Sequence, residues 1–164
     1  PDAQPNKAHL ALAELEKTGK LKAVITQNID GLHQKAGSHE VLELHGSVLR
    51  NYCMKCHKAY SLDDILKQDG IPYCDCGGMI KPDVVLYEEG LDSDILNRSV
   101  NHIRHADLLI IGGTSLAVYP AAGLIDYFSG KHLVLINRDK TARDSHADLV
   151  ITQPIGEVLG SIEI

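Results

Sequence analysis

The 164-residue sequence lacks any apolar run of about 18 residues, so it offers no candidate transmembrane helix. Its start, Pro1–Pro5, also lacks the basic and then apolar pattern of a secretory signal. Basic residues are in the minority: 16 Lys and Arg stand against 22 Asp and Glu, which gives a net charge of −6. Because binding a phosphate backbone needs a basic face, nucleic acid is not an expected partner. Without a long apolar run, a membrane is not an expected partner either. We expect a cytoplasmic protein.

Cysteine is also scarce, and the four cysteines lie close together. The spacing is Cys53-x2-Cys56, then a gap of 17 residues, then Cys74-x-Cys76. Two disulfides in a secreted protein and four free thiols in a reducing compartment are both alternatives. The paired spacing favours two short knuckles that present four thiolates to one zinc ion, with His57 as an alternative ligand. Four protein ligands leave no open position for water, so a structural zinc site is expected.

Hydrophobic residues make up 44% of the sequence, which is enough for a core, and they form apolar runs that alternate with helical patterns. The patterns predict strands at 22–26, 41–44, 84–86, 107–111, 132–136 and 149–151. They predict helices at 8–15, 62–67, 93–103, 120–128 and from Pro154 onward. Apolar strands separated by helices indicate a parallel sheet covered on both faces. The expected fold is α/β, with a parallel sheet formed by the parts at 1–48 and 83–164 and a zinc-ribbon module at 49–82.

Polar side chains follow the first two of these strands. Gln27, Asn28 and Asp30 come directly after the first strand, where open α/β sheets bind their ligands. Their donors and acceptors can hydrogen-bond an amide and a ribose. Such a cluster also forms simple Asx-capped turns. His45, followed by Gly46, ends the second strand and is either a general base in a cleft or a polar cap.

A second polar group follows the later strands. Gly112-Gly113-Thr114-Ser115 combines glycines, which let a ligand approach the backbone, with hydroxyls that donate to phosphate oxygens. The full G-x-G-x-x-G fingerprint is absent, so this segment is a partial phosphate site or a tight strand-to-helix turn. Asn137 follows the strand at 132–136, at a place where a polar residue commonly reads a ribose.

Taken in order, these motifs resemble the sirtuins, in their bacterial-like form, over essentially the whole chain. The series is Thr26-Gln-Asn-Ile-Asp-Gly-Leu-His33, Ala36-Gly37, Glu43-Leu-His-Gly46, the four cysteines, Lys81-Pro-Asp-Val-Val85, Gly113-Thr-Ser-Leu116 with Val118 and Pro120, and Leu135-Ile-Asn137. The resemblance implies a Rossmann-like domain with a small zinc domain, and NAD-dependent deacylation of acyl-lysine proteins. In that reaction the acyl oxygen attacks the ribose carbon, nicotinamide leaves, and free lysine and an O-acyl-ADP-ribose form.

The resemblance also implies roles for individual residues. His45 matches the base that accepts a proton from the ribose hydroxyls, and Gln27, Asn28 and Asp30 match the residues around the nicotinamide ribose. The other matches are Gly112, Thr114 and Ser115 for phosphate and ribose, Asn137 for adenosine, and Val85 and Tyr87 for the strip that pairs with the substrate peptide.

The sequence departs from the family pattern in two places. After Val85 many sirtuins have two aromatics and Gly-Glu, whereas Leu86–Gly90 here leaves acyl and peptide preference open. The family's opening Gly-Ala-Gly loop and Pro-Asp-Phe-Arg element, with the first strand and helix, are missing from these residues. We therefore expect this chain alone to be inactive. The alternative functions are a sirtuin-like ADP-ribosyltransferase and a zinc-binding module without catalysis.

Overall fold

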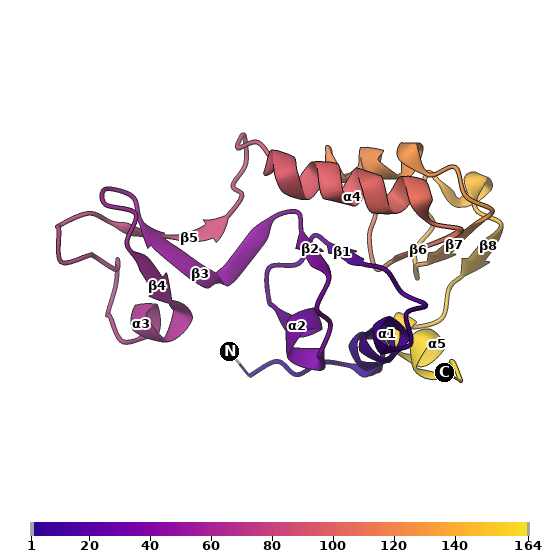
Figure 1. Ribbon diagram of the computed structural model, residues 1–164, viewed down its shortest axis with the longest axis horizontal. Coiled ribbons are helices and arrows are strands. Elements are labelled where there is room, and N and C mark those ends of the chain that lie inside the picture. Colours follow the sequence, from indigo (N-terminus) through magenta and orange to yellow (C-terminus); the bar gives the residue numbers. More distant parts are fainter. Residues whose placement is uncertain (1, 164) are drawn as a thin grey trace. The chain divides into compact units, whose positions relative to one another are not determined.

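The computed structural model describes residues 2–163, which divide into two compact units. The first unit contains the described residues up to Ile25, Leu32–Leu42 and the described residues from Asp92 onward. The second contains Thr26–Gly31 and Glu43–Leu91, a range that includes the expected module at 49–82. The chain passes between the units within β1 (Val24–Thr26) and β2 (Val41–Glu43), which pair with each other (Figure 1). Within residues 2–163, the helices are too short or too polar to cross a membrane.

The first unit is built on a parallel sheet, as the apolar strands predicted. Its strands run in the order β6 (Leu108–Gly112), β7 (His132–Ile136) and β8 (Leu149–Ile151). Leu109 faces Leu133, and Val134 faces Leu149, in a continuous parallel register. The α/β class with a parallel sheet is therefore confirmed.

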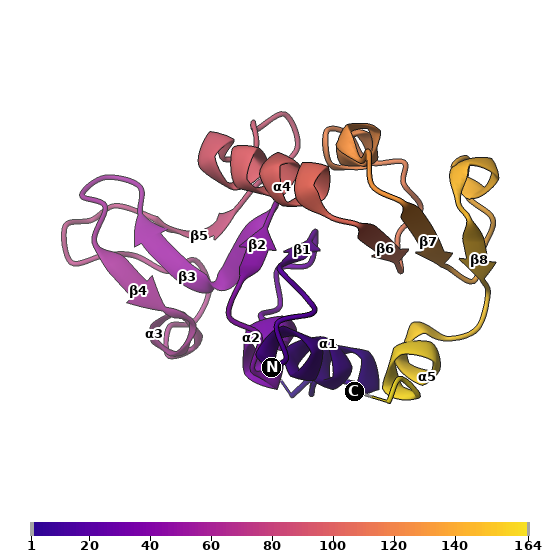
Figure 2. The ribbon, with the colours of Figure 1, turned by 45° about the vertical axis from the view of Figure 1, so that its right-hand side comes forward.

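Helices cover both faces of this sheet. On one face, α1 (Lys7–Lys17) and α5 (Ile155–Gly160) bury Ala8, Ala11 and Leu159 against Ile136. Figures 1 and 2 show α4 (Ser93–His105) and the 3-10 helix η1 (Ala121–Tyr127) on the other side of the sheet. The shorter elements are α2 (Leu32–Ala36) and the 3-10 helix η2 (Asp144–His146). Asn6 caps α1 and Asp92 caps α4, because the side chain of each accepts backbone N–H groups of the first turn.

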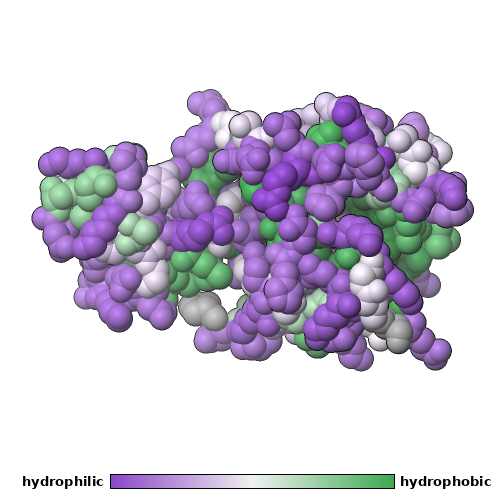
Figure 3. All heavy atoms as spheres, viewed as in Figure 1, coloured by the Kyte–Doolittle hydropathy of each residue, from purple (hydrophilic) through white to green (hydrophobic). Residues whose placement is uncertain are grey.

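Apolar side chains remain exposed on both outer strands of the sheet. They are Leu108 and Ile110 on β6, and Leu149 and Val150 on β8. Figure 3 shows hydrophobic side chains at the surface in the region of β8. Outer strands with exposed apolar side chains favour association with further protein surface.

The second unit contains an antiparallel sheet that the sequence analysis did not predict. Its strands lie in the order β4 (Ala59–Ser61), β3 (Gly46–Cys53) and β5 (Ile80–Val84), and α3 (Leu62–Leu66) follows β4. Arg50 on β3 donates to Glu43 at 2.7 Å and to Asp83 on β5 at 2.9 Å, which ties the strands together. The register between β3 and β5 shifts between Ser47 and Asn51.

Two predicted elements and the predicted place of His45 differ from the structure. The strand expected at 84–86 ends at Val84, because Leu86 starts a turn in which the Glu89 N–H bonds the Leu86 carbonyl. The helix expected at 120–128 is a 3-10 helix, closed by bonds such as that from Gly123 to Pro120. His45 lies between two strands rather than at the end of one, because Gly46 opens β3.

Gly46 has a backbone conformation and a neighbour that both require glycine. Its φ is +74°, and a Cβ at this position would collide with the Asp83 carbonyl of β5. Gly70, in the same unit, has a φ of +77° but open space around it. Gly70→Ala should therefore lower the free energy of unfolding by only the cost of the left-handed backbone, about 1–2 kcal/mol. Gly46→Ala adds an overpacking cost of about 1–3 kcal/mol.

Chemical denaturation of the two variants measures this difference. We expect Gly46→Ala to lower the free energy of unfolding clearly more than Gly70→Ala does. Equal losses in the two variants would show that the contact between Gly46 and Asp83 is not tight.

Candidate functional site

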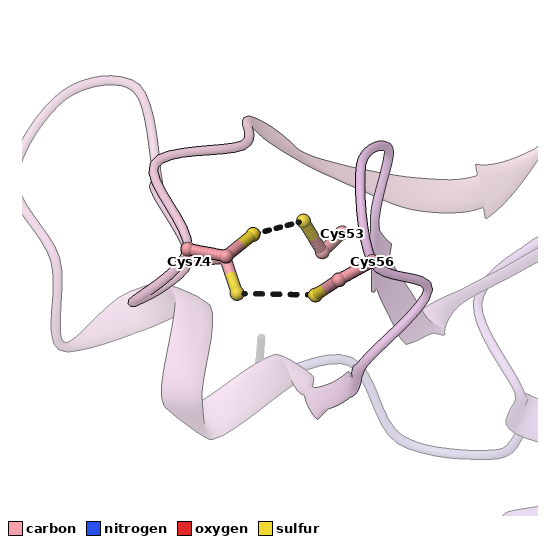
Figure 4. A group of neighbouring side chains, drawn as sticks. Cys53, Cys56 and Cys74 are labelled. Atoms are coloured by element: carbon pink, nitrogen blue, oxygen red, sulfur yellow. Dashed lines mark hydrogen bonds between the residues drawn. The ribbon is translucent and has the colours of Figure 1, made fainter.

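The four cysteines come together into one cluster of sulfur atoms. Cys53 ends β3, Cys56 follows in the next turn, and Cys74 and Cys76 lie in the loop before β5. The Sγ atoms of Cys53 and Cys76 are 3.5 Å apart, those of Cys56 and Cys74 are 3.6 Å apart, and all four lie within 4.8 Å of one another. Figure 4 shows Cys56 pointing toward Cys74, with Cys53 in the same cluster and dashed lines for the two sulfur contacts. His57 is not part of this group.

These distances fit a tetrahedral zinc ion. With Zn–S bonds of about 2.3 Å, the sulfurs of a tetrahedron lie about 3.8 Å apart. Cys53 and Cys74 are buried among Ile80, Tyr60 and Ile65, so the cluster is also the core of its module. The arrangement is therefore that of a closed structural site rather than a catalytic one.

The electrostatics of the cluster also favour a bound cation. The N–H of Cys76 and the hydroxyl of Tyr60 lower the pKa of Cys74 to about 6. The N–H of Gly78 favours the thiolate of Cys76, but the neighbouring sulfurs outweigh it and raise the pKa of Cys76 to about 12. Four thiolates this close repel one another, and a divalent cation among them allows all four to ionise.

His45 is held in one tautomer by a backbone carbonyl. Its Nδ1 lies 3.1 Å from the carbonyl oxygen of Gln27. A carbonyl can only accept a hydrogen bond, so in the neutral imidazole Nδ1 carries the proton and Nε2 is the acceptor nitrogen. The half-buried ring is therefore oriented as a proton acceptor at Nε2.

The polar turn Thr26–Gly31 is fixed to the segment that carries His45. The N–H of Leu44 donates to Thr26 at 2.9 Å, and the N–H of Val48 donates to Ile29 at 3.1 Å. Gly31 has a φ of +71° and packs against the side chain of Leu49. Gln27, Asn28 and Asp30 thus lie in the same unit as His45, on a turn anchored at both ends.

Val85 and Tyr87 lie in the same unit as His45 and follow β5 in the sequence. The N–H of Val85 donates to the carbonyl of His45 at 3.1 Å, and Tyr87 is fully exposed. No role was predicted for Glu89, whose carboxylate accepts from the N–H of Leu86 at 2.8 Å and pairs with Lys81 at 3.1 Å. The only local turn signal was Gly90, because glycine is common in turns.

The remaining predicted residues lie at the carboxyl edge of the parallel sheet, in the first unit. Gly112 and Ile136 are register partners, so Asn137 directly follows the strand beside Gly112. The side-chain amide of Asn137 donates to the backbone carbonyl of Asp139 at 2.8 Å. Its backbone N–H donates to the carbonyl of Ile151 at 3.0 Å.

The glycine-rich segment at this edge is open to a ligand. A Cβ on Gly112 would collide with Ile155 of α5, whereas Gly113, with a φ of +63°, has open space around it. Thr114 bonds the N–H of Leu116 through its hydroxyl at 3.2 Å, and Ser115 is exposed. The exposed backbone at Gly113 leaves room for the close approach of a phosphate.

A separate cavity of about 330 Å³ lies near the start of β7 and before β8. Its lining includes Phe128, Lys131 and Arg143, and Arg143 pairs with Asp126 at 2.8 Å. None of the residues predicted to contact a cofactor lines it.

Comparison with known proteins decides the family. The family model described as the Sir2 family matches residues 1–120. The chain belongs to the Sir2 family, the sirtuins. The resemblance inferred from the ordered motifs is therefore confirmed.

Bacterial sirtuins share much of this sequence. The NAD-dependent protein deacetylase of Clostridium perfringens is 62% identical over 164 residues, which cover 99% of this chain and 67% of that protein. The enzyme of the same name from Cutibacterium acnes is 55% identical, over 99% of this chain and 67% of the relative. The chain thus spans about two thirds of the length of these sirtuins.

Solved sirtuin structures share the fold. A structure described as Sir2 with a p53 peptide and NAD⁺ is 44% identical and has a TM-score of 0.90, over 96% of this chain and 68% of that one. A structure of Sir2 bound to an acetylated peptide is 43% identical and also has a TM-score of 0.90. The sirtuin fold is therefore shown for nearly the whole chain.

Proposed function

We propose that this chain forms the main part of an NAD-dependent protein-lysine deacylase. The observation that carries the proposal is the orientation of His45, whose Nδ1 bonds the Gln27 carbonyl and whose Nε2 is left as a proton acceptor. The names of the bacterial relatives and the acetylated peptide bound to a related structure support the same activity. The substrate is then an acyl-lysine in a protein or peptide.

The proposed roles follow the positions described above. His45 is the general base, and the cysteine cluster holds a structural zinc ion. Peptide contacts are assigned to Val85, whose N–H bonds the His45 carbonyl, and to Tyr87 in the same unit. The proposed NAD contacts are Gln27, Asn28 and Asp30 for the nicotinamide ribose, Gly112, Thr114 and Ser115 for phosphate and ribose, and Asn137 for adenosine.

The chemistry that the chain supplies is binding, orientation and one proton transfer. NAD supplies the ribose carbon, which the acyl oxygen of the substrate attacks as nicotinamide leaves. His45 then accepts a proton at Nε2 from a ribose hydroxyl, while the Gln27 carbonyl stabilises the imidazolium through the Nδ1 proton. One water is consumed as the bond between the acyl group and the lysine nitrogen is cleaved, and the products are free lysine, nicotinamide and an O-acyl-ADP-ribose.

The second candidate function is ADP-ribosyl transfer to an acceptor side chain. It uses the same NAD contacts and differs only in the nucleophile. A zinc-binding module without catalysis is the third candidate, and the ordered polar turn beside His45 argues against it. We also assign the protein to the cytoplasm, because a cluster of reduced thiolates suits a reducing compartment.

Nicotinamide release tests this function. A fusion that adds the uncovered third of the Clostridium perfringens relative should release nicotinamide from NAD only when an acetyl-lysine peptide is present. The 164-residue polypeptide alone should bind NAD weakly and should not turn over, because the Gly112–Ser115 segment contacts only part of a dinucleotide.

Other outcomes identify the alternatives. Release of nicotinamide in the presence of a peptide that lacks the acetyl group would favour ADP-ribosyl transfer. Zinc content without NAD binding in the fusion would favour the non-catalytic module. Micromolar NAD binding by the 164-residue polypeptide would contradict the expectation for the chain alone.

A further inference from the structure

The segment after β5 is a tight turn held in place by one carboxylate. The N–H of Glu89 donates to the Leu86 carbonyl at 3.1 Å, which closes the turn. The side chain of Glu89 accepts from the N–H of Leu86 at 2.8 Å and pairs with Lys81 at 3.1 Å. Lys81 also donates to the Val84 carbonyl at 3.1 Å, so the turn is anchored to the end of β5.

Tyr87 and Glu88 form the tip of this turn and project into solvent. Tyr87 is fully exposed, and Glu88 is exposed with a φ of +72°, in the left-handed region that favours glycine. A non-glycine residue in this region carries a backbone cost, and the surrounding bonds hold it there. The turn therefore presents an aromatic ring and a carboxylate side by side.

Glu88 is the uncompensated charge of this region. Its neighbours Asp83 and Glu89 are paired with Arg50 and Lys81. Within residues 2–163, no ion pair of Glu88 is present, so its negative charge faces the solvent next to the Tyr87 ring. An exposed ring with an adjacent carboxylate suits a cationic side chain, which can interact with both.

The tip lies beside the strip assigned to the substrate peptide. β5 is an outer strand of its sheet, and the N–H of Val85, which follows it, donates to the carbonyl of His45. A peptide paired along this strip would carry its acyl-lysine near His45 and its flanking residues near the tip.

We propose that Tyr87 and Glu88 select acyl-lysine peptides with a Lys or Arg within two residues of the acylated lysine. This inference rests on the proposed function, because it needs the peptide to bind along the strip of Val85 and Tyr87. The tip adds a charge preference that the rest of the strip does not specify. A ring contact and an exposed ion pair together correspond to about 3- to 30-fold in affinity at low salt.

Fluorescence anisotropy with labelled acetyl-lysine peptides tests the preference. The peptides carry Lys, Gln or Glu at the two residues on each side of the acetyl-lysine and are otherwise identical. Their binding is measured with the zinc-loaded chain and with the fusion that adds the uncovered third of the Clostridium perfringens relative. We expect the Lys peptides to bind about 3- to 30-fold more tightly than the Gln peptides, with the Glu peptides weakest. The difference should shrink at high ionic strength.

Variants assign the preference to the tip. Glu88→Gln and Tyr87→Leu should each reduce the ratio between Lys and Gln peptides. Asp63→Asn removes an exposed carboxylate on α3 of the same unit and controls for net charge. It should leave the ratio unchanged.

Four outcomes would overturn the inference. Equal binding of all peptides, or a Lys preference that survives Glu88→Gln, would show that the tip does not read charge while leaving the deacylase proposal intact. If Asp63→Asn reduced the ratio of Lys-peptide to Gln-peptide affinity as much as Glu88→Gln does, the preference would come from net charge. Binding of no acetyl-lysine peptide by either protein would overturn the peptide strip and the proposed function together.

Discussion

Replacing Cys74 with serine should abolish zinc binding and unfold the antiparallel sheet of the second unit. The ligands are not preorganised in the unfolded chain, so the free energy of zinc binding, about 10–16 kcal/mol at a structural site, becomes free energy of folding. The cysteine cluster is also the core of its module, with Cys53 and Cys74 buried against Ile80. Zinc analysis should find one ion per chain in the reduced parent protein and none in Cys74→Ser.

Hydrogen exchange locates the effect. Protection in β3, β4 and β5 should be lost in Cys74→Ser and after chelation, whereas the parallel sheet β6–β8 should keep its protection. Met54→Ser is the matched control, because Met54 lies between two of the cysteines and is exposed. A Cys74→Ser chain that lacks zinc but keeps the protection of β3 would refute a structural role for the metal.

Replacing His45 with alanine should lower turnover by about 10²- to 10⁴-fold in the fusion that deacylates. The loss is expected in kcat, while the affinities for NAD and peptide stay within a few-fold, because the imidazole acts as a proton acceptor rather than as a binding group. Steady-state kinetics with an acetyl-lysine peptide measures both parameters.

His105→Ala is a suitable control for this variant. The Nδ1 of His105 also bonds a backbone carbonyl, that of Asn101 at 2.8 Å, but on the exposed surface of α4. Normal turnover in His105→Ala is expected. Normal turnover in His45→Ala would return His45 to the role of a polar group between two strands.

The elements predicted correctly from the sequence are those that local signals define. The apolar helical pattern at 8–15 predicted α1, and the unbroken apolar run at 132–136 predicted β7 with its exact bounds. The paired spacing of the cysteines predicted the cluster, because two residues at short spacing reach a common ion through local geometry alone.

The elements that were missed depend on contacts between distant residues. β3 shows no regular alternation of buried residues, and its pairing with β5 shifts register between Ser47 and Asn51. Its stability comes from contacts such as that of Arg50 with Asp83, which are far apart in the sequence. No local pattern contains that information.

The same limit applies to the candidate site. The pattern at His45 left a base and a strand cap as alternatives, since the tautomer depends on a carbonyl 18 residues away, that of Gln27. Likewise, the exposure of Glu88 follows from the way Glu89 closes its turn. The resemblance to sirtuins supplied roles for these positions, and the structure supplied the contacts that make the roles physically reasonable.

The products of one reaction decide whether this sirtuin is a deacylase. Mass spectrometry of the fusion with NAD and an acetyl-lysine peptide should find nicotinamide, deacetylated peptide and O-acetyl-ADP-ribose in equal amounts. The acetyl group should appear on ADP-ribose because its oxygen attacks the ribose carbon. Free acetate formed without nicotinamide, or ADP-ribose attached to the peptide, would contradict the proposed function.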